Sequence, residues 1–167
     1  SNDTHMITFN KLCYWERELR ADAIFIDQAE GTTVYTLATN LGKVSWYLIN
    51  FANSATDHPE FKQSQYGNIR AQMYYESRDA LMKEAVIDSK DEKWIPEIVS
   101  QLTWTKGTRH KVHNKKMAIA KSEIKDLYGK SPDVADGFVL LYAAPVLERL
   151  PENSNDIGGG LVTGNSP

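Results

Sequence analysis

The sequence of 167 residues has a single cysteine, Cys13, and no long apolar run. One cysteine excludes a disulfide framework within the chain and is typical of proteins that fold in a reducing compartment. Because the chain also lacks a membrane-length apolar run and a signal-peptide pattern, we expect a soluble, intracellular protein with no membrane partner. No Walker-type phosphate loop occurs, so no ATP site of that class is expected.

The chain has little net charge, but its positive charge is concentrated in one segment. The net charge is −3, which by itself does not indicate a nucleic-acid-binding protein. Seven basic residues and one acidic residue lie between Lys106 and Lys125. Such a segment is often only a solvated surface, but it also suits contacts to a nucleic-acid backbone. The candidate DNA-binding residues are Lys106, Arg109, Lys111, Lys115 and Lys116.

Hydrophobic periodicity predicts alternating helices and strands. Strands are expected at 22–27 and 43–49 with a helix at 32–41 between them, which is the pattern of a parallel βαβ unit. Other predicted elements are helices at 5–20, 68–83, 91–101, 121–128 and 131–147, and a long loop at 50–66.

A β-hairpin is predicted where the basic residues cluster, with arms at 102–105 and 116–120 around a turn at 106–114. We expect residues 1–150 to form one domain. Residues 151–167 are rich in Gly, Ser and Asn and are predicted to be a disordered tail.

The segment from Ser131 to Asp136 has the features of a helix start that carries two acids. Ser131 is a favoured N-cap and Pro132 suits the first helical position. Asp133 and Asp136 are three residues apart, so they are predicted to share a helix face. The helix dipole alone favours acids in a first turn, so both capping and metal binding stay open.

Asp27 ends the first predicted strand, and functional sites of open parallel sheets lie beyond the carboxyl ends of strands. Together with Asp133 and Asp136 it is a plausible ligand set for Mg²⁺ or Mn²⁺, because hard cations take carboxylate oxygens. A turn or helix-capping role is the alternative for Asp27. His110 and His113 have no Cys or acid cluster beside them, so no zinc site is expected.

Four stretches, in this order, resemble the C-terminal nuclease domain of bacteriophage large terminase subunits. Residues 21–31 (ADAIFIDQAEG) resemble its central strand with the second metal-binding acid, and residues 44–51 (VSWYLINF) resemble the following strand. Residues 66–74 (YGNIRAQMY) resemble its Y-x-N-x-R-A-x-M helix start. Residues 121–136 resemble its ending, which closes with G-x-S-P-D-x-A-D. The resemblance spans about residues 5–147.

The resemblance implies an RNase H-like α/β fold with a mixed sheet, helices packed on it and a basic β-hairpin. It implies a nuclease that uses Mg²⁺ or Mn²⁺ to cut double-stranded viral DNA during packaging, in the cytoplasm of a bacterial host. Asp27 would be the second catalytic and metal-binding acid, and Asp133 or Asp136 the third. The hairpin would guide the duplex, and the implied partners are DNA, the terminase ATPase domain, the small terminase subunit and the portal.

The family's first strand, which carries the first catalytic acid, has no counterpart here, and Asp3 has no apolar strand around it. We therefore expect a truncated domain with weakened metal binding, with cleavage reduced or lost, and with apolar sheet edges that favour oligomerisation. Two alternatives remain open. One is a non-catalytic DNA-binding or packaging-assembly module that keeps the fold, and the other is another RNase H-like enzyme such as a recombinase or transposase.

Overall fold

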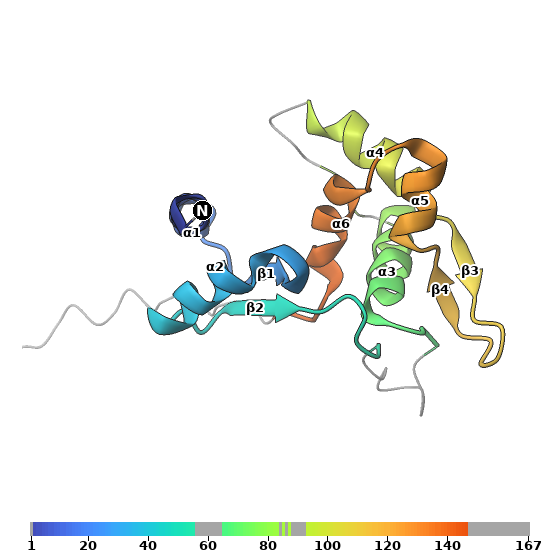
Figure 1. The fold of residues 1–167 in the computed structure, drawn as a ribbon, viewed down its shortest axis with the longest axis horizontal. Helices are drawn as coiled ribbons and strands as arrows, with labels where there is room; N and C mark the ends of the chain where they lie inside the picture. Colours follow the sequence, from blue (N-terminus) through green and yellow to red (C-terminus); the bar gives the residue numbers. More distant parts are fainter. Residues whose placement is uncertain (1, 56–64, 84, 86, 88–92, 147–167) are drawn as a thin grey trace, which may run out of the picture.

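The computed structural model describes residues 2–55, 65–83, 85, 87 and 93–146 (Figure 1). The predicted tail and most of the predicted 50–66 loop lie outside the described residues. Within them, no helix has the length and apolar character that crossing a membrane requires. The elements in chain order are α1 (Asn2–Glu18), β1 (Ile24–Asp27), α2 (Gln28–Asn40), β2 (Trp46–Ile49), α3 (Ile69–Lys83), α4 (Trp94–Trp104), β3 (Gly107–Arg109), β4 (Lys116–Ala118), α5 (Lys121–Tyr128), α6 (Asp133–Val139) and the 3-10 helix η1 (Leu140–Tyr142).

The predicted parallel βαβ unit is confirmed, with Asp27 at the end of β1 opposite Ile49 at the end of β2. Helix α2 begins at Gln28, earlier than the predicted residue 32, because Asp27 caps it. The Asp27 backbone is extended, and its Oδ1 accepts a hydrogen bond from the Ala29 N–H at 3.0 Å. Gly31 then lies against β1, where an added Cβ would stand 2.0 Å from a methyl carbon of Ile26.

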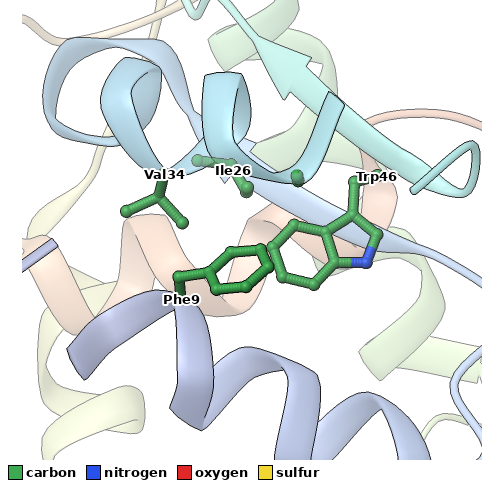
Figure 2. Close-up of a cluster of buried hydrophobic side chains, with 5 residues drawn as sticks. Phe9, Ile26, Val34 and Trp46 are labelled. Atoms are coloured by element: carbon green, nitrogen blue, oxygen red, sulfur yellow. The ribbon is translucent and has the colours of Figure 1, made fainter. Parts of the chain in front are cut away.

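One face of the β1–β2 pair packs on the first hydrophobic core (Figure 2). Ile26 of β1 and Trp46 of β2 meet Val34 of α2 and Phe9 of α1 there, and the Phe9 and Trp46 rings lie 5.5 Å apart. Trp46 is 2% exposed and belongs to this core. Because successive side chains of a strand point to opposite faces of the sheet, Phe25 and Ile49 lie on the face opposite to this core.

The other face of the strand pair packs on a second core, which α3, α6 and η1 build beside it (Figure 1). Phe25 and Ile49 contact this core, whose buried residues are Met73, Tyr74, Ala135, Val139 and Ala143. The two strands therefore join both cores. Asp27 shares the face of Phe25, which places its carboxylate at the junction between β1 and the α3–α6 side.

The hairpin prediction is correct in its return arm, where β4 lies, and wrong in its first arm, because β3 falls within the predicted turn. Residues 102–104, predicted as a strand, instead complete α4, and the antiparallel pair is β3 with β4. Leu102 packs on the second core, and the Trp104 ring stacks on Tyr128 at 4.9 Å. This packing overrides the strand preference of the Leu-Thr-Trp-Thr segment.

The predicted helix at 131–147 is shorter than expected, because α6 ends at Val139 and continues only as η1. Ser131 is not its cap: Pro132 holds that position and makes no side-chain capping bond. Parallel and antiparallel strands are both present, in two separate two-stranded sheets among the described residues. Each strand of the β1–β2 pair thus has one edge without a strand neighbour in the described part of the chain.

Glu16 ties α1 to the start of β2. Its carboxylate accepts hydrogen bonds from the Trp46 indole N–H at 2.8 Å and from the Lys43 ammonium. Burial raises the pKa of the Glu16 carboxyl, but the hydrogen bonds from Lys43 and Trp46 and the charge of Lys43 outweigh it, so the pKa lies below its usual value. The ionised form therefore stabilises the folded state.

We predict that Glu16→Ala lowers the free energy of unfolding by about 1–3 kcal/mol, because the buried Trp46 N–H loses its acceptor. Since folding lowers the pKa of Glu16, its contribution is fully present above the unfolded-state pKa and is lost as the pH falls through the folded-state pKa. Urea denaturation at neutral and acidic pH measures both effects. Glu18→Ala, at an exposed site on the same helix, is the control and should change stability by less than about 0.5 kcal/mol. Equal losses in the two variants would contradict the role of Glu16.

Candidate functional site

Two carboxylates and one ammonium meet at the carboxyl end of β1. With Oδ1 of Asp27 engaged in capping α2, its Oδ2 is left facing Lys121 Nζ at 3.8 Å. Lys121 is the first residue of α5, and its Nζ lies 2.8 Å from Oδ2 of Asp136 on α6. The ammonium is therefore a bridge between acids that are far apart in the sequence.

Asp136 is a buried acid whose Oδ1 has two partners from α3. It is 3% exposed, and its Oδ1 accepts a hydrogen bond from the Tyr74 hydroxyl at 2.9 Å. Arg70 Nε also lies 3.4 Å from Oδ1. A buried carboxylate without such partners would be strongly destabilising, so these contacts from α3 allow Asp136 to sit inside the protein.

The cations of the cluster are themselves held in place. Arg70 Nη1 donates to the Ile119 carbonyl at 2.7 Å, and its guanidinium lies 4.9 Å from the centre of the Tyr74 ring. Lys121 Nζ lies 5.0 Å from the centre of the Phe51 ring. Burial raises the pKa of Tyr74, and the charge of Asp136 raises it further, which keeps the hydroxyl protonated as a donor.

Two buried polar atoms of the cluster lack a hydrogen bond within the described residues: Oδ2 of Asp136 and Nη2 of Arg70. The 2.8 Å approach of Lys121 to Oδ2 is thus an ion pair that lies off the direction of a hydrogen bond. A buried carboxylate oxygen without a hydrogen bond depends on a cation beside it, whether an ammonium or a metal ion.

Asp133 does not join this cluster. It is the first residue of α6 and is exposed, whereas Asp136, one turn later, is buried. The structure thus brings together two of the three predicted acids, Asp27 and Asp136. Among the described residues, no three His, Cys, Asp or Glu side chains gather as a metal site.

Arg70, Tyr74 and Lys121 are site residues that were not predicted from the sequence. All three lie within stretches that carry the family resemblance, but nothing in the local sequence shows that they would converge. The sequence does contain one signal of a buried ion pair: Arg70 is a charged residue between Ile69 and Ala71 at the start of an amphipathic helix. A buried arginine there requires a buried acid as its partner.

The predicted DNA-binding residues divide into two groups. Arg109 donates to the Asn114 carbonyl at 3.0 Å, and Lys116 Nζ lies over the rings of Tyr66 and Tyr75 at 5.5 and 5.2 Å, so both shape the hairpin. In the second group the side chains make no hydrogen bond or ion pair with the described residues; it consists of Lys106, Lys111 and Lys115.

The two hairpin histidines contact each other. The rings of His110 and His113 stack at 5.0 Å, and His110 Nδ1 accepts the backbone N–H of Val112 and of His113, both at 3.3 Å. These contacts close the turn and give both rings a structural role.

No family model matches the chain, and no curated protein is significantly similar to it. Solved structures are similar to it. The nuclease domain of the large terminase subunit gp2 of bacterial virus Sf6 superimposes with a TM-score of 0.63 at 19% identity, covering 80% of this chain and 70% of that one. A point mutant of the same domain with manganese gives a TM-score of 0.62 at 19% identity, covering 79% and 70%. The same mutant with calcium gives a TM-score of 0.62 at 19% identity, covering 79% of this chain and 69% of that one.

At this level of identity the likeness establishes the fold. It confirms the RNase H-like α/β fold and the resemblance to terminase nuclease domains that the sequence predicted.

We predict that Tyr74→Phe lowers the free energy of unfolding by about 1.5–3 kcal/mol, because a buried carboxylate loses a hydrogen bond. The matched control is Tyr75→Phe on the same helix, whose hydroxyl makes no hydrogen bond with the described residues. That variant should change stability by less than about 0.5 kcal/mol. Chemical denaturation followed by tryptophan fluorescence measures both, and a Tyr74→Phe variant as stable as the wild type would refute the network.

Proposed function

We propose that this chain is a divalent-metal-dependent endonuclease domain of a phage DNA-packaging terminase, acting on double-stranded DNA. The observation that carries the proposal is the convergence of Asp27 and Asp136 on one ammonium at the carboxyl end of β1. This is the edge where parallel α/β sheets place their functional groups. The similarity to a terminase nuclease domain, whose structures include forms with manganese and with calcium, supports the same conclusion.

The two acids fit a hard divalent cation. Both present a carboxylate oxygen to the same point, and Oδ2 of the buried Asp136 has no hydrogen bond within the described residues. Mg²⁺ is commonly held by one or two carboxylates, with waters and substrate phosphates completing its shell. Asp27 and Asp136 would hold the ion, and when bound it activates water and stabilises the leaving oxygen of a phosphodiester.

The other side chains orient these acids. Tyr74 and Arg70 hold Oδ1 of Asp136, which leaves Oδ2 to Lys121, whose ammonium also approaches Asp27. Capping of α2 holds Asp27 in the same way. Lys121 neutralises both carboxylates at its present position, so it competes with a metal ion for the same oxygens. Its side chain is part-exposed, which leaves it room to turn toward a DNA phosphate.

We predict that Asp27→Asn and Asp136→Asn each reduce Mn²⁺-dependent nicking of a supercoiled plasmid by more than about tenfold, because each removes a metal-binding carboxylate. Asp133→Asn and Asp126→Asn should cut at nearly the wild-type rate, since both residues are exposed and outside the cluster. Circular dichroism confirms folding of each variant. Undiminished cutting by Asp27→Asn would show that the site assignment is wrong.

The second candidate function is a DNA-binding or packaging-assembly module that keeps the fold without cleavage. It is favoured by the charge balance of the cluster, where Lys121 and Arg70 already neutralise the two acids. It is also favoured by the failure of a third acid to join them within the described residues. Salt-dependent duplex binding by a wild-type chain that never nicks DNA in Mn²⁺ or Mg²⁺ would establish this alternative.

In both cases the hairpin would carry the DNA contact. We predict that the triple replacement of Lys106, Lys111 and Lys115 by Ala weakens duplex binding and makes the slope of log K against log salt shallower by about 2–3, one phosphate contact per lysine. The control replaces three exposed cations at the other end of the molecule, Lys11, Arg17 and Arg20. It removes the same charge and should leave the slope unchanged. Equal effects of the two triple variants would exclude the hairpin as the DNA contact.

The wider partners follow from the same proposal. A packaging nuclease domain would act beside an ATPase domain, a small terminase subunit and a portal. The edge of the β1–β2 pair that lacks a strand neighbour in the described residues is where another strand, from a longer chain or a second copy, would add.

A further inference from the structure

We infer that Gln101 of α4 is a positioning residue for the metal-binding face of α6, an inference that rests on the proposed function. Gln101 is 2% exposed, although glutamine is rarely so buried. Its Oε1 accepts the backbone N–H of Val134 at 2.9 Å and of Ala135 at 3.1 Å. These are the donors of the first turn of the helix that carries Asp136.

The first turn of α6 has no cap of its own. Pro132 occupies the cap position and makes no side-chain capping bond. The free N–H groups of a helix start must find an acceptor when they are buried. Gln101, 33 residues away from Val134 in the sequence, supplies that acceptor from a different helix, so it locks α6 to α4 at the end where the acids lie.

Glu97 sets the orientation of the Gln101 amide. Its Oε1 accepts from Gln101 Nε2 at 2.6 Å and from Lys130 Nζ at 2.8 Å. A carboxylate attracts the NH₂ end of an amide, so the carbonyl end must face α6. The chain of contacts therefore runs from Lys130 through Glu97 and Gln101 to the backbone of the two residues that precede Asp136.

The position of Asp136 follows from two restraints. Tyr74 and Arg70 of α3 hold its carboxylate, and Gln101 of α4 holds the start of its helix. Metal affinity depends on the orientation of the ligand, and partners that fix a ligand from behind are worth about 10–100-fold in affinity. Loss of Gln101 should therefore weaken metal binding in a protein that remains folded.

The test compares Mn²⁺ affinity, by isothermal titration calorimetry, in the full chain and three variants. Gln101→Met keeps the length of the side chain and removes both polar ends, and we expect it to weaken Mn²⁺ binding about tenfold or more. Thr103→Ala, which removes an exposed side-chain hydrogen bond to Ser100 on the same helix, should bind within about twofold of wild type. Thermal melting confirms that each variant is folded.

A charge-preserving exchange supplies the rescue. In Glu97→Gln/Gln101→Glu the amide and the carboxylate trade places, so the acceptor for Val134 and Ala135 and the bond between the two helix positions are both kept. We expect Mn²⁺ affinity to return to within about threefold of wild type, because the geometry that fixes α6 is restored. A loss as large as that of Gln101→Met would overturn the inference.

The outcomes separate this inference from the proposed function. A wild-type chain that binds no Mn²⁺ would reject the metal site itself. A wild-type chain that binds Mn²⁺ as tightly as Gln101→Met does would reject only the positioning role. Amide hydrogen exchange at Val134 and Ala135 is independent of metal, and unchanged protection of both in Gln101→Met would also overturn the inference.

Discussion

The burial of the Asp136 carboxylate is the constraint on which the rest of the structure depends. A charge that is 3% exposed is tolerated only with opposite charges and hydrogen-bond donors around it. Those partners come from two elements: Arg70 and Tyr74 from α3, and Lys121 from α5. Lys121 in turn approaches Asp27 at the end of β1. One buried acid therefore sets how four elements meet.

The two hydrophobic cores explain why this meeting point lies where it does. The β1–β2 pair packs on α1 and α2 with one face and on α3, α6 and η1 with the other. A strand pair shared between two cores has little freedom to shift, because both faces are covered by packed side chains. Asp27 at the end of β1 is thus held rigidly at the boundary, opposite Asp136. The site is polar because it lies at the ends of the strands, outside both apolar cores. Backbone and carboxylate groups there need hydrogen bonds or opposite charges as partners.

Much of the chain was predictable from local patterns. The βαβ unit followed from two apolar strands around a helix, and α5 matches its prediction at 121–128 because Gly129 ends it in a left-handed conformation. Predictions failed where distant residues decide the outcome. Residues 102–104 are helical because Leu102 and Trp104 pack on other elements, and Ser131 is not a cap because Gln101 takes that role. The residues near such a segment in the sequence do not show which distant residues will pack against it or cap it.

By itself, the sequence determined which residues were able to carry chemistry: Asp27 at a strand end, two acids at a helix start and lysines in a hairpin. Tertiary structure alone decided which of them act together. It buried Asp136 and left Asp133 in solvent, it brought Lys121 between Asp27 and Asp136, and it turned Arg109 and Lys116 into supports of the hairpin. The physical reason is that spacing along a helix or strand determines only on which face of that element a side chain lies. The charge and burial that it meets depend on elements folded against that face from elsewhere in the chain.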